Sequence, residues 1–187
     1  MLTFSQYIRE FVETETEYEP KFTKMSSGEI AKKGKVGESL HTDRFEIRPV
    51  DIDNEDRMYT VHDKHSGEHV GTVRGTKVAK GYFRVDEVTK QKGVHPKMMH
   101  EVYNSILNSG TSMMSSGSIS RKAHKVWKDL QSSGRQVDYV KTSFSGKKMT
   151  IHPTQGGTNV EPDFNKHVEK MSANKMQNAK VYRIKAK

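Results

Sequence analysis

Hydrophobic and polar residues alternate with a period of two through the middle of the chain, a pattern typical of strands that bury one face. The alternating segments are 45–50, 58–62, 69–74 and 82–88. A turn of Lys, His, Ser and Gly at 64–67 separates the second segment from the third, so these two predict a β-hairpin. A second hairpin is predicted farther along, where 139–142 and 149–152 flank a Phe-Ser-Gly-Lys turn.

The hydrophobic period changes to that of a helix after residue 95. Pro96 suits the first position of a helix, because the N–H that proline lacks has no partner there. Six large apolar residues follow and give this helix a broad apolar face: Met98, Met99, Val102, Tyr103, Ile106 and Leu107. Gly110 is expected to end it.

Residues 111–130 predict a short strand, a Ser/Gly turn and a second amphipathic helix. Ser120 suits the N-cap, because its hydroxyl can accept a hydrogen bond from a free N–H of the first turn. The apolar positions recur at i, i+3, i+4 and i+7: Ala123, Val126, Trp127 and Leu130. Gly134 is the expected stop, and a strand follows at 137–141.

The two ends of the chain differ in composition from this middle part. One face of a predicted N-terminal helix carries Leu2, Phe4, Tyr7, Ile8 and Phe11. Two interpretations of this helix stay open: it packs on the chain's own core, or Leu2, Phe4, Tyr7 and Phe11 bind a partner. We therefore divide the chain into an N-terminal helix and arm (1–43), a folded domain (44–153) and a basic C-terminal extension (154–187).

Composition restricts the classes of function. The formal net charge of +9 favours acidic partners, unless the lysines only solvate the surface. The chain has no cysteine, which excludes thiol catalysis, disulfides and cysteine zinc sites. His62, His65 and His69 have the spacing of metal ligands but straddle a turn, so we expect no metal site. No apolar run is long enough to span a membrane, and we expect a soluble protein with no membrane partner.

The strand, the turn S-x-x-x-S, the helix R-K-A-x-x-x-W-x-x-L and the glycine that follows it resemble the second half of a GNAT-type N-acetyltransferase domain. The likeness is closest to the small versions found in tailed bacteriophages. It covers 44–153, where the order of predicted elements also matches. The resemblance implies an α/β fold with a mixed central sheet flanked by helices, here with an N-terminal helical arm and a basic C-terminal tail.

In enzymes of this family, a glycine-rich turn at a helix N-terminus binds the pyrophosphate of acetyl-CoA through backbone N–H groups. The matching turn is 89–96, which has one glycine and ends in proline. The residues that would bind the cofactor are Gln91, Lys92, Gly93 and Lys97. The alternative is an ordinary solvated loop.

The resemblance also places the general base, which would be Asp86 or Glu87 at the end of a central strand. The alternative is that these carboxylates form salt bridges. Many family members use a tyrosine as the acid, whereas the matching position here is Trp127, whose indole cannot serve. Tyr103 and Tyr139 are the substitutes that lie near it in the sequence.

Basic residues gather on the second helix, at Arg121, Lys122, His124, Lys125 and Lys128, and again in the tail. They favour at most a weak, sequence-independent contact with nucleic acid. Two functions remain. The first is a non-catalytic virion or interaction protein that binds other viral or host proteins, in the virion or the host cytoplasm. The alternative is an active acetyltransferase that modifies an amine.

Overall fold

The computed structural model describes residues 34–78, 81–117, 119–145, 148–152, 160, 163–166 and 178–186. They divide into two compact units, which are described separately. The N-terminal unit comprises the described residues up to Met114 together with 185–186, and the C-terminal unit comprises the described part of Ser115–Ile184. The predicted helix that carries Leu2, Phe4, Tyr7 and Phe11 lies outside the described residues.

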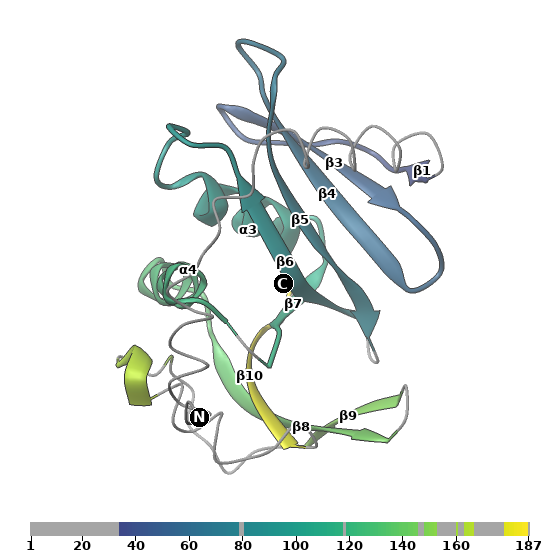
Figure 1. Cartoon of the computed structure of the whole chain (residues 1–187), viewed down its shortest axis with the longest axis vertical. Coiled ribbons are helices and arrows are strands. Elements are labelled where there is room, and N and C mark those ends of the chain that lie inside the picture. Colours follow the sequence, from purple (N-terminus) through teal and green to yellow (C-terminus); the bar gives the residue numbers. More distant parts are fainter. Residues whose placement is uncertain are drawn as a thin grey trace, which may run out of the picture. The chain divides into compact units, whose positions relative to one another are not determined.

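The N-terminal unit is built on a sheet with one helix beside it (Figure 1). Its elements are β1 (Lys35–Val36), β2 (Leu40–His41), β3 (Phe45–Asp51), β4 (Asp56–Asp63), β5 (His69–Val78), β6 (Tyr82–Lys90), α3 (Met98–Asn108) and β7 (Ser112–Ser115), whose last residue begins the C-terminal unit. The strands lie in the order β1-β3-β4-β5-β6-β7, and β2 pairs with β3. Each pairing from β1 to β6 is antiparallel.

The alternation along these strands produces the core of the sheet. Ile47, Val61 and Gly71 stand opposite one another on three neighbouring strands, and the first two are fully buried. Gly71 leaves room for α3, because a Cβ there would lie 2.4 Å from the terminal methyl of Met98. The predicted hairpin of β4 and β5 is confirmed, with Gly67 in its turn at a φ of 72°.

Helix α3 buries all six of the apolar residues that the sequence assigns to its face. It begins at Met98, two residues after Pro96, so the prediction that Pro96 opens the helix is wrong by two positions. The cause is local, since the Met98 N–H donates to the carbonyl of His95 over 3.0 Å and closes a tighter turn there. Gly110 follows the helix at a φ of 87°, as expected for a stop.

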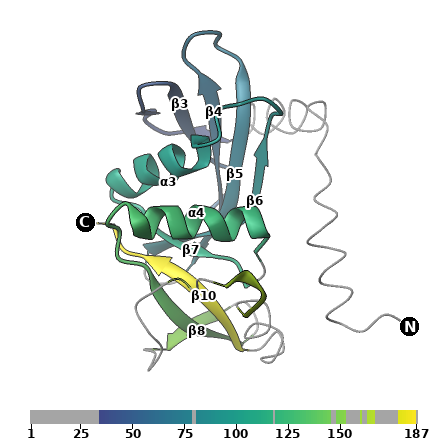
Figure 2. The ribbon, with the colours of Figure 1, turned by 90° about the vertical axis from the view of Figure 1, so that its left-hand side faces the viewer.

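The C-terminal unit contains α4 (Arg121–Ser132), β8 (Asp138–Ser145), β9 (Lys148–His152) and β10 (Asn178–Ile184) (Figure 2). β8 pairs antiparallel with β9, which confirms the second predicted hairpin. β8 also pairs antiparallel with β10, which lies in the segment that the sequence assigned to a basic extension. Val181, Tyr182 and Ile184 are buried, so this part of the tail belongs to the core of the unit.

Helix α4 has the N-cap that its sequence predicts, but only two of the four predicted apolar positions are buried, because Ala123 and Val126 are half-buried. The Ser120 hydroxyl accepts a hydrogen bond from the Ala123 N–H over 3.1 Å. Trp127 and Leu130 are fully buried. Gly134 follows at a φ of 91°, and its N–H donates to the carbonyl of Gln131 over 3.0 Å.

The chain is thus a mixed α/β protein with mostly antiparallel strands and few helices in its described part. Within the same residues, no helix is long and apolar enough to cross a membrane.

Candidate functional site

The predicted base Asp86 lies in β6, where the pairing with β5 is irregular. Arg74 pairs with Glu87 and Gly75 with Val85, so Asp86 is the extra residue of a β-bulge. Arg84 Nε donates to Asp86 Oδ1 over 2.6 Å, and the Thr76 hydroxyl donates to Oδ2 over 2.7 Å. Both carboxylate oxygens of Asp86 therefore already accept hydrogen bonds from the chain itself, through the lone pairs that a general base would use.

Glu87, the other predicted base, is half-buried next to this bulge. None of the residues that the structure describes forms an ion pair with it. Of the two carboxylates, Glu87 is therefore the one whose oxygens stay available to a proton.

The predicted cofactor turn leads from β6 into α3. Gly93 adopts a φ of 83°, and Gln91 continues the sheet by donating its N–H to the carbonyl of Val70 over 2.9 Å. The His95 ring accepts the Lys97 N–H at Nδ1 over 3.3 Å, while its carbonyl accepts the Met98 N–H. Two N–H groups at the start of α3 are therefore bonded within the turn, where a bound pyrophosphate would need free donors.

The Lys90 side chain also forms a hydrogen bond within the same turn. Lys90 Nζ donates to the carbonyl of His95 over 3.1 Å. Lys92 and Lys97 are exposed. The turn can therefore attract an anion through lysine charge but offers few backbone donors to bind it.

The aromatic residues considered as catalytic acids belong to the core. Trp127 is 1 % exposed. Tyr103 is buried as well, and burial raises the pKa of its hydroxyl well above the usual value. Tyr139 packs against Tyr182, with ring centroids 5.2 Å apart. None of these three side chains is placed to give a proton to a departing thiolate at the surface.

The histidines of the β4–β5 hairpin form hydrogen bonds to threonines. His62 Nε2 lies 3.2 Å from the Thr60 hydroxyl and His69 Nε2 lies 2.9 Å from the Thr72 hydroxyl. Burial lowers the pKa of His62. Among the residues with a described position, no cluster of three or more His, Asp or Glu side chains could hold a metal ion.

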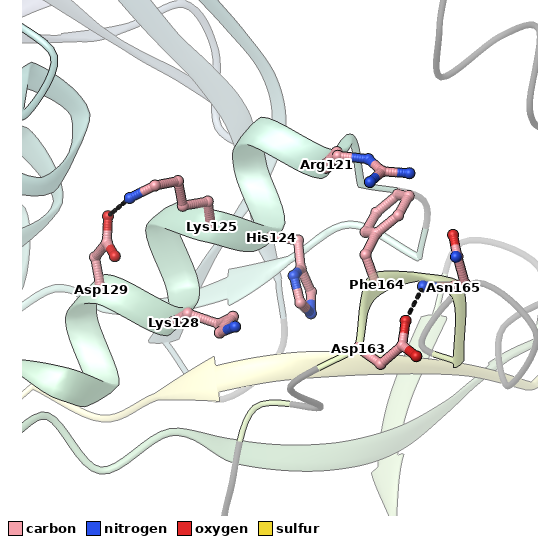
Figure 3. Close-up of a pocket in the computed structure, with 8 residues that line it drawn as sticks. All are labelled: Arg121, His124, Lys125, Lys128, Asp129, Asp163, Phe164 and Asn165. Atoms are coloured by element: carbon pink, nitrogen blue, oxygen red, sulfur yellow. Dashed lines mark hydrogen bonds and ion pairs between the residues drawn. The ribbon is translucent and has the colours of Figure 1, made fainter.

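A cleft of about 580 Å³ lies beside α4 in the C-terminal unit (Figure 3). α4 contributes Arg121, His124, Lys125, Lys128 and Asp129, and the segment 163–165 contributes Asp163, Phe164 and Asn165. We call this the α4 cleft. The three cations recur at i, i+4 and i+7, so they follow one edge of the helix while Trp127 and Leu130 face the core.

Aromatic contacts shape the inner wall of the α4 cleft. The Arg121 guanidinium lies over the Phe164 ring, 5.2 Å from its centroid. The His124 ring meets Phe164 edge-on at 5.5 Å (Figure 3). His124 is 3 % exposed, so the prediction that it lies with the lysines on a basic helix face is wrong. It packs between Phe164 and Tyr182 instead.

Sequence reasoning missed the contribution of 163–165 to this cleft. Asp163 Oδ1 accepts the Asn165 N–H over 2.9 Å and thereby caps a helical turn at 164–166. The sequence Asp-Phe-Asn contains this cap signal, but nothing in it shows that the turn lies against α4. The cations Arg121, Lys125 and Lys128 could be assigned to this helix from the sequence, whereas the aromatic wall that Phe164 and His124 form could not.

Comparison with known proteins finds no family model and no curated protein that matches the chain.

Proposed function

We propose that this chain is a non-catalytic binding protein with a GNAT-like fold of the bacteriophage kind. It acts as a structural or interaction component in the virion or the host cytoplasm, with viral or host proteins as partners. The order of elements supports the likeness, since antiparallel strands β3 to β6 are followed by α3, β7, α4 and β8. This is the order that the resemblance implies for residues 44–153.

One observation carries the non-catalytic part of the proposal. Asp86 and the predicted cofactor turn, two of the places where the resemblance implies catalytic or cofactor-binding residues, already form hydrogen bonds within the chain. Asp86 accepts hydrogen bonds from Arg84 and Thr76, and His95 accepts two of the N–H groups at the start of α3. A cofactor or substrate would first have to displace these contacts, which lowers the binding free energy it gains.

An active acetyltransferase is the second candidate, and Glu87 favours it. This carboxylate lies beside the bulge of β6, three residues before the lysines of the turn begin. With acetyl-CoA held by Lys92 and Lys97, Glu87 would be the base that removes a proton from an amine.

Titration of the full-length protein with acetyl-CoA in a calorimeter separates the two candidates. The non-catalytic proposal predicts no saturable heat up to about 1 mM acetyl-CoA, the upper end of ordinary substrate affinities. A dissociation constant below about 10 µM would contradict it and support the transferase.

Matched charge variants show whether any measured binding of acetyl-CoA takes place at the turn before α3. The double variant Lys92→Glu and Lys97→Glu reverses the charge of the turn, and Lys35→Glu with Arg44→Glu changes the net charge equally elsewhere on the N-terminal unit. All four side chains are exposed. Binding lost in the first variant and kept in the second would assign the cofactor to the turn. These changes also avoid Gly93, where any side chain would strain the backbone.

A further inference from the structure

We infer that the α4 cleft binds a single strand of nucleic acid through its phosphate backbone. The inference goes beyond the proposed function: to a binding protein whose proposed partners are proteins, it adds nucleic acid as a second class of ligand. It places the contact on Arg121, Lys125 and Lys128, with Phe164 as the residue that positions Arg121.

The first support is the linear arrangement of charge. Arg121 and Lys128 are seven residues apart, so the cations extend over about 10 Å of helix axis. A row of cations matches a ligand whose negative charges repeat along a line, which is the form of a nucleic-acid backbone. A single phosphate or carboxylate group would use one end of the row and leave the other unmatched.

The second support is the way Arg121 is held. Its guanidinium stacks on Phe164, and no described residue forms an ion pair with it. Stacking fixes the plane of the guanidinium while its edge keeps N–H donors for phosphate oxygens. Because His124 contacts the same ring edge-on, Phe164 is itself held in place (Figure 3).

Two carboxylates in the cleft set the strength of the contact. Asp129 pairs with Lys125 over 2.9 Å, and Asp163 caps the turn at 164–166. They partly offset the three cations, so we expect weak binding that is independent of sequence, with a dissociation constant on the order of 10 µM at low salt. An acidic protein is less favoured, because the carboxylates of a protein surface are interspersed with other side chains, whereas every nucleotide of a strand carries a phosphate.

The test is fluorescence anisotropy of a labelled strand of about 20 thymidines, a length that exceeds the usual site size, with the full-length protein. Three phosphate contacts predict a slope near −2 for the logarithm of the association constant against the logarithm of salt concentration. The double variant Arg121→Glu and Lys128→Glu removes two contacts, so we expect binding at least about tenfold weaker and a slope near −0.7.

Two further variants separate the site from general charge and from misfolding. Lys35→Glu with Arg44→Glu makes the same change in net charge on the N-terminal unit, at residues that do not line the cleft, and should leave the slope unchanged. Phe164→Leu keeps every charge and should weaken binding about twofold to fivefold by releasing Arg121. Thermal melts of each variant show whether its fold is kept.

Three results would overturn the inference. They are equal losses in the two double variants, no binding at about 100 µM protein in low salt, or tighter binding of a polyglutamate peptide than of the strand. None of them alters the heat measured with acetyl-CoA, so failure here and failure of the non-catalytic proposal are distinguishable.

Discussion

At the scale of single residues, Trp127 occupies the position where the resemblance implies a catalytic acid, but its side chain belongs to the core. It is the largest of the fully buried side chains, and its ring lies 6.0 Å from that of Tyr182. Trp127→Ala should lower the free energy of unfolding by about 3–5 kcal/mol, because it leaves a large cavity. Urea denaturation measures this, with Trp127→Phe as the milder control. An alanine variant as stable as the parent would contradict a core role.

Substitutions at Gly75 and Gly93 compare the loss of stability from a steric clash with the loss from backbone strain. A Cβ on Gly75 would lie 1.9 Å from the carbonyl oxygen of Arg84, whereas a Cβ on Gly93 would meet nothing within 4 Å. Gly75→Ala should therefore cost more than about 2 kcal/mol of stability, since the strand pairing must shift. Gly93→Ala should cost about 1 kcal/mol, from its φ of 83° alone. Thermal melts that reverse this order would contradict the described packing of β5 against β6.

The ion pair of Asp51 with Arg57 makes stability depend on pH. Two hydrogen bonds from Arg57 lower the pKa of Asp51 from 3.8 to about 2. Because the folded-state pKa is the lower one, the stabilisation is complete above pH 3.8 and is lost as the pH falls toward 2. Asp51→Asn should cost about 1 kcal/mol at neutral pH, after allowance for solvent screening at a partly exposed site.

Denaturation of the parent and of Asp51→Asn at a series of pH values measures this contribution. The difference between their free energies of unfolding should shrink between pH 4 and pH 2. A difference that stays constant across this range would show that the pair does not shift the titration.

At the scale of elements, the N-cap residue Ser120 stabilises helix α4, which carries Arg121, Lys125 and Lys128. Ser120→Ala removes the acceptor of the Ala123 N–H and should cost about 1 kcal/mol. Ser120→Asp should restore most of this stability, because its carboxylate also accepts from the first turn and favours the positive end of the helix dipole. Chemical denaturation compares the three proteins. No loss of stability in Ser120→Ala would show that the cap contributes little.

Most elements could be predicted from the sequence because their signals are local. The period-two segments became β3 to β6, and both predicted hairpins formed. β10 was missed because its pairing partner β8 is about 40 residues away, and no local signal records a contact of that range. The predicted start of α3 was two residues too early, because the His95 carbonyl accepts the Met98 N–H. The pattern of apolar residues does not reveal this hydrogen bond.

At the scale of the whole chain, the net charge of +9 predicted an acidic partner but not where it binds. The α4 cleft depends on contacts between α4 and Phe164, which are about 40 residues apart in the chain. The strand that carries Asp86 and Glu87 and the turn at 91–97 that follows it could be predicted from the sequence, because their signals are local. The hydrogen bonds from Arg84 to Asp86 and from the Lys97 N–H to the His95 ring could not, because they depend on side-chain geometry.

The central claim is that the binding chemistry of this chain lies on α4 and not in the turn before α3. Hydrogen–deuterium exchange of the full-length protein tests it directly, with acetyl-CoA in one sample and the thymidine strand in another. We predict slower exchange in 121–132 and 163–166 with the strand, and no change in 90–99 with acetyl-CoA. Protection of 90–99 by acetyl-CoA, with α4 unchanged by the strand, would contradict the claim and support the transferase candidate.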